Sequence, residues 1–270
     1  MKITFLGGGN MANALIGGML KQGMAATDIV VVDPGGDARA RLAAAYGIAC
    51  FESADALGGA GDLLVLAVKP QQMKEAVAPL GGKLGNAVVI SIAAGLDLPT
   101  LSRFLGGHRK IVRCMPNTPA LIGEGITGLC SLPEVTDDER AAADRILSAV
   151  GSTVWIADEG KMDGVTALSG SGPAYVFLFI EAMQQAAADL GFPPEQGRQL
   201  AIATVQGAAA LAAQSSDPAA LLRERVTSKG GTTEAALRVM AEAGVKEGII
   251  SGIKAAEARG RELGKLLGGE

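Results

Sequence analysis

The sequence begins MKITFLGGGNMANALIGGML (residues 1–20), and this stretch decides the fold. Its first residues form a short apolar run of strand formers, and a helical pattern of apolar residues follows without a linker. Between the two, Gly7, Gly9 and Ala12 match the pattern G-x-G-x-x-G/A. We expect Gly7 to permit a tight turn, Gly9 to let a pyrophosphate approach the backbone, and Ala12 to let the helix pack closely on the strand.

The residues around this turn favour a bound dinucleotide. The helix would present free amide N–H groups and the positive end of its dipole to a phosphate. Asp33 follows at about the distance at which dinucleotide-binding chains carry an acid for the ribose hydroxyl. A glycine-rich turn is a weak signal alone, and a plain tight turn is the alternative. The preceding strand, the following helix and Asp33 together favour dinucleotide binding.

The composition limits the possible classes of protein. Of 270 residues, 49% are hydrophobic and only 3% are aromatic, so a large core has to consist of alanine and aliphatic residues. The net charge of −4 and the pI of about 5.2 argue against a nucleic-acid partner. No apolar run reaches the length of a membrane span, and glycines interrupt the N-terminal run, so we expect neither a membrane partner nor a signal peptide.

Cysteine and histidine usage points to the cytoplasm and away from a metal site. Cys50, Cys114 and Cys130 are odd in number and far apart, as expected of reduced thiols in a cytoplasmic protein. His108 is the only histidine, and we expect it to be an exposed residue of a Gly-Gly-His-Arg turn. We therefore expect no metal.

Strand-like runs and helical patterns alternate through the first half of the chain. The runs lie near residues 2–6, 28–33, 47–51, 62–68, 86–92 and 109–114. The helical patterns lie near residues 10–22, 37–46, 70–80 and 97–105. The alternation predicts an α/β, Rossmann-type doubly wound parallel sheet, which binds ligands beyond the carboxyl ends of its strands.

From about residue 160 the pattern changes to helices alone. They lie near residues 162–168, 172–191, 194–214, 217–226, 233–242 and 245–266. We therefore expect a dinucleotide-binding domain over residues 1–160 and an all-α domain over residues 161–270. The second domain is rich in alanine and poor in large side chains, so burial against a second copy would stabilise it. We interpret it as a dimerisation domain, with a compact alanine-rich bundle as the alternative.

Two glycine-containing stretches of the helical half need more than helix packing to explain them. LSGSGPAY (168–175) has the small residues and the proline of a capped helix start. VTSKGGTTEAAL (226–237) places two glycines and two threonines before a helical pattern. Backbone N–H groups in such a turn can receive a carboxylate, and a hydroxyl can donate to a ligand.

At the level of whole motifs, the sequence resembles the pyrroline-5-carboxylate reductase family over essentially its full length. The motifs that carry the resemblance are FLGGGNMA, LAVKP (66–70), SIAAG (91–95), RCMPNTPA (113–120), LSGSGPAY and VTSKGGTT (226–233). The resemblance implies reduction of 1-pyrroline-5-carboxylate to L-proline, the last step of proline biosynthesis, by hydride transfer from NAD(P)H. It also implies an interlaced dimer, and dimers of this family often assemble into decamers.

The resemblance implies roles for the matching residues. The pyrophosphate would be held by Leu6, Gly7, Gly8, Gly9, Asn10 and Met11. The nicotinamide side of the cleft would be lined by Ala67, Val68, Lys69, Pro70, Ile92, Ala93 and Ala94, with Asn117 touching the nicotinamide or its ribose. The substrate would be bound by Ser228, Gly230, Gly231, Thr232 and Thr233. Thr233 would hydrogen-bond the ring nitrogen and is the expected catalytic residue.

Some features depart from the family or leave alternatives open. Lys229 stands where relatives usually carry proline, and it either assists carboxylate binding or is solvated. Arg225 stands where they usually carry a neutral amide, a change that could alter ribose contacts. The resemblance favours NADPH, and Arg39 or Arg41 could pair with its 2′-phosphate. Asp33 favours NADH, so we expect both cofactors to work.

Two rival functions can be compared with the sequence. Another imine or β-hydroxyacid reductase would carry a lysine on the first long helix of the second domain, and residues 172–191 contain none. A non-catalytic nucleotide-sensing protein would be expected to lose the glycine stretches of the second domain, and both are present.

Overall fold

The structure is a computed structural model, and it describes residues 1–57 and 59–269. The chain forms two compact units. The first comprises Met1–Ser171 and the end of the last helix from Ala256 onward, and the second comprises Gly172–Ala255. The first unit therefore extends beyond the division predicted at residue 160 and takes in a segment from the far end of the chain.

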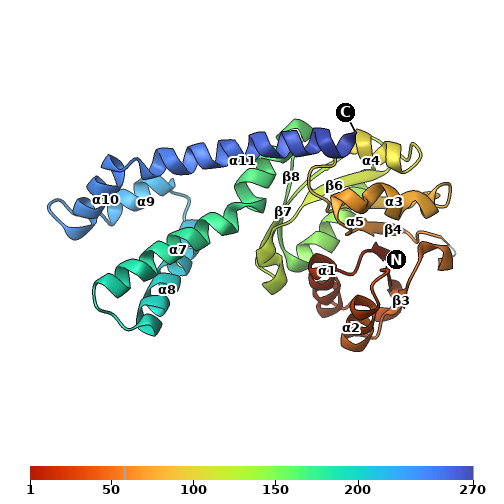
Figure 1. Cartoon of the computed structure of the whole chain (residues 1–270), viewed down its shortest axis with the longest axis horizontal. Coiled ribbons are helices and arrows are strands. Elements are labelled where there is room, and N and C mark those ends of the chain that lie inside the picture. Colours follow the sequence, from red (N-terminus) through yellow and green to blue (C-terminus); the bar gives the residue numbers. More distant parts are fainter. Residues whose placement is uncertain (58, 270) are drawn as a thin grey trace. The chain divides into compact units, whose positions relative to one another are not determined.

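In the described part of the chain, the first unit is built on one sheet of eight strands in the order β3-β2-β1-β4-β5-β6-β7-β8. Figure 1 shows strands of this sheet together with helices of the same unit. The strands are β1 Ile3–Leu6, β2 Ile29–Val32, β3 Ala49–Phe51, β4 Leu63–Leu66, β5 Val88–Ser91, β6 Ile111–Met115, β7 Gly125–Ser131 and β8 Gly151–Trp155. From β3 to β6 all neighbours are parallel. The chain reverses its strand order at β1, between β2 and β4, which is where dinucleotide-binding sheets open a crevice.

Helices cover both faces of this sheet, and each face has its own core. One face packs against α1 Asn10–Lys21, α2 Gly36–Tyr46 and α5 Asp137–Leu147. The other packs against α3 Met73–Val77, α4 Leu98–Phe104, α6 Met162–Val165 and the end of α11 Val245–Gly268. β1, β4 and β5 are buried along their whole length, as expected of central strands.

The six predicted strands and the alternation with helices are confirmed, but the sheet is larger and only mostly parallel. β7 pairs with β6 in the antiparallel direction, and β8 is parallel to β7. β7, β8 and α5 were not predicted. His108, expected to be exposed, is half-buried, and its Nε2 lies 2.9 Å from the carbonyl oxygen of Ala87.

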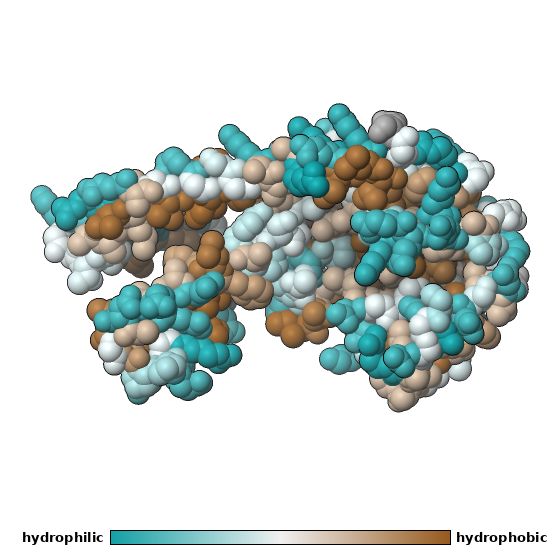
Figure 2. Space-filling model, viewed as in Figure 1, coloured by the Kyte–Doolittle hydropathy of each residue, from teal (hydrophilic) through white to brown (hydrophobic). Residues whose placement is uncertain are grey.

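The second unit consists of helices, as predicted, and buries almost nothing within one chain. Its helices are α7 Gly172–Asp189, α8 Pro194–Gln214, α9 Ala219–Arg225, α10 Thr232–Glu242 and the first part of α11. Only Gly197 and Ala201 are buried among residues 172–255, all of which are described. Large apolar side chains are exposed instead (Figure 2), among them Phe177 and Leu178 of α7 at 64% and 66%. This unit therefore lacks a core of its own.

Within residues 1–57 and 59–269, one helical stretch, Glu159–Asp189, is long and apolar enough to span a membrane, and 6% of its most apolar window is buried. A helix whose apolar residues are covered by another protein chain is expected to show the same length, apolar composition and low burial. The α6–α7 connection within this stretch is a π-helix, Thr166–Gly170, which contains most of the LSGSG motif.

Candidate functional site

The glycine turn between β1 and α1 has the geometry predicted for it. Gly7 has a φ of +103°, and a Cβ added there would lie 2.6 Å from the carbonyl oxygen of Ala67, so a side chain does not fit. Above Gly9 there is open space within 4 Å. Gly9 is also the N-cap of α1, and no side chain caps this helix. Ala12 is fully buried. The first amides of α1 thus face a space that a phosphate can enter.

Asp33 holds this turn in place from the end of β2. One carboxylate oxygen accepts a hydrogen bond from the Gly8 amide at 2.7 Å, and the other accepts from the Gly35 amide at 2.7 Å. Arg39 donates to the carbonyl of Asp33 at 2.6 Å, and Arg41 donates to the carbonyl of Gly8 at 3.1 Å. Each carboxylate oxygen therefore accepts one backbone amide, and the two arginines bind backbone carbonyls of the loops after β1 and β2.

A cavity of about 500 Å³ opens at the carboxyl ends of β1, β2 and β4. Of the predicted cofactor residues, it is lined by Leu6, Gly7, Gly9, Asp33, Ala67, Val68 and Lys69. Gly8, Asn10, Met11 and Pro70 are their neighbours in the chain. The volume is of the size found for small-molecule sites.

Some of the residues that line this cavity were not predicted. Glu52, Ser53 and Ala54 follow β3, and Gln72 and Glu75 lie in the segment after β4. The signal for the first group was present, because β3 is parallel to β2 and its carboxyl end had to lie at the same edge of the sheet.

Ile92, Ala93, Ala94 and Asn117 do not line this cavity; they follow β5 and β6 farther along the same edge of the sheet. The Asn117 side chain is buried, and its amide group donates to the carbonyl of Ser169 at 3.1 Å. Its oxygen accepts from the Ile126 amide at 3.0 Å. Asn117 thus joins β6 and β7 to the LSGSG motif, and its contact with a nicotinamide stays a prediction.

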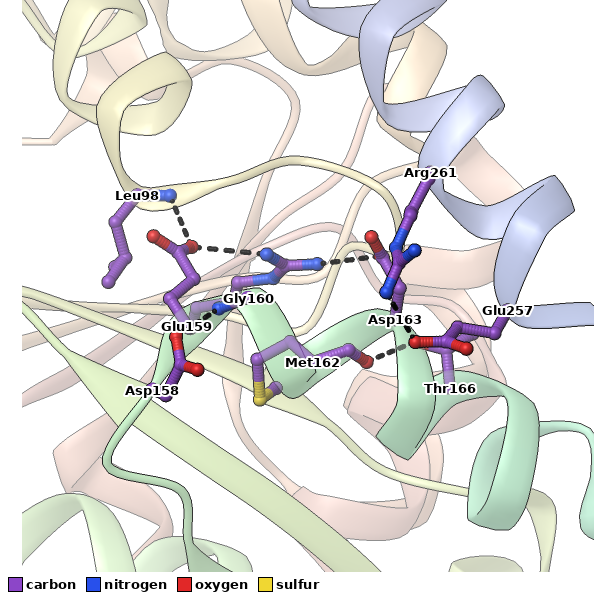
Figure 3. Close-up of polar contacts among 10 residues, drawn as sticks. Leu98, Asp158, Glu159, Gly160, Met162, Asp163, Thr166, Glu257 and Arg261 are labelled. Carbon is purple, nitrogen blue, oxygen red and sulfur yellow. Dashed lines mark hydrogen bonds and ion pairs between the residues drawn. The ribbon is translucent and has the colours of Figure 1, made fainter. Parts of the chain in front are cut away.

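A buried arginine of β6 pairs with two partly exposed carboxylates (Figure 3). Arg113 of β6 is 7% exposed, and its guanidinium lies 3.1 Å from Glu159 and 3.5 Å from Asp163. Glu159 also accepts a hydrogen bond from the Leu98 amide at 2.7 Å. Sequence analysis gave these residues no role: Arg113 opens the motif RCMPNTPA, but its two carboxylate partners lie about 50 residues later in the chain and only the fold brings them together.

The predicted substrate loop lies in the second unit, between α9 and α10. Gly230 has a φ of +74°, and its amide donates to the Glu234 carboxylate at 2.7 Å. The Gly231 amide donates to the carbonyl of Ser228 at 3.0 Å. Thr232 and Thr233 are the first residues of α10, so their amides lie beyond the reach of intrahelical acceptors. The loop therefore gathers backbone donors, and Glu234 occupies one of them.

The two unusual residues near this loop differ in their surroundings. Lys229 is exposed. Arg225 pairs with Asp217, whose carboxylate accepts from its guanidinium, so its charge is balanced within the second unit. Among the described residues no group of three or more histidine, cysteine or acidic residues could hold a metal.

Two family models match the chain. Residues 2–95 match "NADP oxidoreductase coenzyme F420-dependent", and residues 159–263 match "Pyrroline-5-carboxylate reductase dimerisation". A pyrroline-5-carboxylate reductase from Pseudomonas aeruginosa is 44% identical over 269 residues, which is 99% of this chain and 98% of that protein. The chain belongs to the pyrroline-5-carboxylate reductase family.

Solved structures agree with this membership of the pyrroline-5-carboxylate reductase family. A pyrroline-5-carboxylate reductase from Coxiella burnetii is 38% identical, with a TM-score of 0.91 over 97% of this chain and 98% of that one. A Plasmodium falciparum pyrroline carboxylate reductase with NADP bound is 29% identical, with a TM-score of 0.87 over 98% of each chain. The match to the dimerisation family covers α6 to α10 and most of α11, which is also where large apolar side chains are exposed.

Proposed function

We propose that this protein reduces 1-pyrroline-5-carboxylate to L-proline with NADPH, and that NADH serves as a second cofactor. Membership of the family over the full chain supports the reaction. The single observation that carries the proposal is the uncapped start of α1, where the open space above Gly9 is flanked by a cavity of about 500 Å³. Such a helix start binds a dinucleotide pyrophosphate through its backbone amides.

NADPH fits the residues of the first unit. The amides at the start of α1 would hold its pyrophosphate, and the absence of a Cβ at Gly9 leaves room for it. Arg39 donates to the carbonyl of Asp33 and lies 3.6 Å from Glu52, and Arg41 donates to the carbonyl of Gly8; both would face a 2′-phosphate. When bound, the cofactor supplies the hydride from its nicotinamide C4.

The loop between α9 and α10 would bind the substrate. We propose that Ser228, Gly230, Gly231 and Thr232 hold the carboxylate, largely through backbone amides. Thr233 would place its hydroxyl at the ring nitrogen. A pyrroline imine is basic and can bind already protonated, so the protein's main contribution is to orient the reacting ring. No further acid–base residue is required by this scheme.

The proposal extends to assembly and location. The second unit lacks its own core, and we propose a homodimer built on it, with further assembly of dimers into a decamer. Cys50, Cys114 and Cys130 are free thiols, which fits a cytoplasmic protein. We propose neither nucleic acid nor a membrane as a partner, in line with the net charge of −4.

The test is an NADPH oxidation assay on the purified full chain. 1-Pyrroline-5-carboxylate should accelerate oxidation, and L-proline should accumulate in equal amount. 1-Pyrroline, which has the same ring without the carboxylate, is the matched control and should react much more slowly. NADPH oxidation that does not depend on 1-pyrroline-5-carboxylate, or that yields no proline, would contradict the proposed function.

A further inference from the structure

Arg113 is a buried charge on a central strand that the proposed reaction does not use. Its side chain is 7% exposed, and it lies between the carboxylates of Glu159 and Asp163 at 3.1 and 3.5 Å. Burying the guanidinium carries a desolvation cost, and an apolar residue of similar volume often stabilises a fold equally well. A role in stability alone is therefore a weak explanation for this cluster. The segments that Glu159 and Asp163 contact point to a different role.

The first connection leads to the loop after β5. Glu159 accepts a hydrogen bond from the amide of Leu98, the first residue of α4, at 2.7 Å. Asp97, the N-cap of the same helix, accepts from the Thr100 amide at 2.8 Å. Figure 3 shows the Leu98 amide pointing at the Glu159 carboxylate. Glu159 thus fixes the end of the loop of residues 92–97.

This loop is also held from its other side. A Cβ added at Gly95 would lie 3.2 Å from Leu267 of α11. A Cβ added at Gly264 of α11 would likewise lie 3.2 Å from the Gly95 carbonyl oxygen, so α11 is close to the loop at this residue too. Residues 92–94, the proposed nicotinamide side of the cleft, therefore lie in a loop that is clamped between α11 and Glu159.

The second connection leads to the LSGSG motif. Asp163 belongs to α6, which continues directly into the π-helix Thr166–Gly170. At the far end of this π-helix, Ser169 accepts the hydrogen bond from Asn117, and a Cβ added at Gly170 would lie 2.5 Å from the Met115 Cε atom. The segment from Asp163 to Gly170 is therefore contacted at both ends from β6 and the residues just beyond it: Arg113 pairs with Asp163, and Met115 and Asn117 contact the end of the π-helix.

We propose that Arg113 is a positioning residue for hydride transfer: by binding Glu159 and Asp163 together, it sets the loop of residues 92–97 against the LSGSG segment at the nicotinamide end of the cleft. The proposal rests on the proposed function, because it concerns the geometry of that reaction. A planar guanidinium can engage two carboxylates in fixed directions, whereas a lysine ammonium is a point charge and cannot reproduce both contacts. A small misplacement of the reacting groups is enough to lower the rate strongly.

Two variants of the full-length protein test this. Arg113→Lys keeps the charge and loses the double contact. Glu159→Ala leaves Arg113 paired with Asp163 and removes the oxygen that accepts from both the Leu98 amide and the Arg113 guanidinium. Arg109→Lys is the matched control, because Arg109 precedes β6 at the opposite edge of the sheet and pairs with Glu134 at 2.8 Å, both partners being partly exposed.

Four measurements are made on each variant. They are kcat with 1-pyrroline-5-carboxylate, the deuterium isotope effect on kcat with NADPH deuterated at the transferred position, the Kd of 2′,5′-ADP, and amide hydrogen exchange in residues 92–98. We expect kcat to fall at least about tenfold in both variants, the isotope effect to rise because hydride transfer becomes slower, and exchange in residues 92–98 to become faster. The Kd of 2′,5′-ADP, which has no nicotinamide, should not change.

The outcomes separate this proposal from the proposed function. A wild-type protein that does not turn over the imine would contradict the function, and the Kd and exchange measurements would still test the cluster. Folded variants with unchanged kcat, isotope effect and exchange would overturn the positioning role. An equal loss of 2′,5′-ADP binding, or failure of both variants to fold while Arg109→Lys folds, would show that the cluster serves the fold generally and would also overturn it.

Discussion

Asp33 has an observed structural role, and we propose that it also affects the choice of cofactor. Its position after β2 suits a free ribose hydroxyl and disfavours a 2′-phosphate, yet both of its oxygens accept backbone amides of the turn and of the following loop. Its negative charge should therefore matter for cofactor choice, while its hydrogen bonds should matter for binding of either cofactor.

Asp33→Ser should accordingly have two effects. The ratio of kcat/KM for NADPH to that for NADH should rise, because a negative charge near the 2′ position is removed. The KM values of both cofactors should rise as well, because the amides of Gly8 and Gly35 lose their acceptors. Steady-state kinetics with each cofactor measure both effects. Asp37→Ser removes an exposed acid from the first turn of α2 and leaves these amide contacts in place. An unchanged ratio in Asp33→Ser would show that its charge does not act on the ribose.

Thr233 is the residue of the second unit that we propose to hydrogen-bond the ring nitrogen of the substrate. It is half-buried at the start of α10. Thr233→Ala should lower kcat/KM for the imine by about tenfold or more, the size expected for one lost hydrogen bond near the reacting nitrogen. The KM for NADPH should hardly change.

The control for this variant is Thr204→Ala, which removes a hydroxyl that donates to the carbonyl of Leu200 within α8 at 2.7 Å. It should leave kcat/KM close to the wild-type value. If Thr233→Ala retained full kcat/KM, Thr233 would have no place in the substrate site.

At the scale of elements, the loop before α10 is shaped by a carboxylate of its own. The Glu234 side chain accepts from the Gly230 amide at 2.7 Å, one of the groups proposed for the substrate carboxylate. The two carboxylates would compete for this donor and repel each other.

Glu234→Gln should therefore lower the KM for 1-pyrroline-5-carboxylate by a few-fold, because a neutral amide oxygen accepts more weakly and adds no repulsion. Inhibition by L-proline should strengthen in parallel, since proline carries the same carboxylate. Glu242→Gln, at the end of the same helix, is the control and should change neither. A higher KM in Glu234→Gln would mean that Glu234 keeps the loop in its binding conformation instead of competing with the substrate.

The elements that sequence analysis found and missed differ in a physical way. β1, β4 and β5 are buried on both faces, so their apolar runs are unmistakable. β7, GITGLCS, contains two glycines and a threonine, and β8 alternates between half-buried and exposed residues. Such strands carry little local signal and are defined by pairing across the sheet. The sequence does contain a signal for α5, because Thr136 and Glu139 have the spacing of a capping box, but sequence analysis did not use it.

The residues of the candidate site also differ in how readily the sequence predicts them. Gly7 and Gly9 were predictable because a local turn fixes their roles. Arg113, Glu159 and Leu98 come from three separate parts of the sequence, and only the fold brings them together. The engagement of both ends of the Asn117 amide was likewise not visible in the motif MPNTP that contains it.

At the scale of the whole molecule, the second unit has apolar residues all round α7. Val176, Phe177, Leu178 and Phe179 are consecutive and 44% to 66% exposed, and four consecutive residues cover every side of a helix. A helix that is apolar all round is stable only when it is buried on all sides.

Leu178→Glu should therefore weaken self-association of the chain. A charge buried in an apolar interface carries a desolvation cost of several kcal/mol, so sedimentation should show dissociation at concentrations where the wild type is associated. The imine reductase activity should fall with it. Leu178→Met keeps the side chain apolar and should behave like the wild type. An unchanged sedimentation profile of Leu178→Glu would exclude this part of α7 from the interface.

The division of the chain into two units leads to a prediction about which functions can be separated. The first unit contains the glycine turn, the cofactor cavity and the Arg113 cluster, and it also needs the end of α11, where Leu267 packs against its core. A fragment of residues 1–160 would lack Asp163 and the buried Met162. A better way to isolate the first unit is to replace residues 172–255 with a flexible glycine–serine linker of about 15 residues, which joins Ser171 to Ala256.

The shortened chain should be monomeric, should bind NADPH and 2′,5′-ADP with near-wild-type Kd, and should not reduce 1-pyrroline-5-carboxylate. Its cofactor residues are all present, whereas the loop that would orient the carboxylate is gone, and an unoriented imine gives the hydride no defined target. Circular dichroism and thermal unfolding first establish that it folds, and fluorescence titration and an oxidation assay then measure binding and turnover separately. Substantial imine reduction by the folded, shortened chain would place the substrate site in the first unit. A folded chain that binds no NADPH would remove the dinucleotide from the turn at Gly7–Gly9.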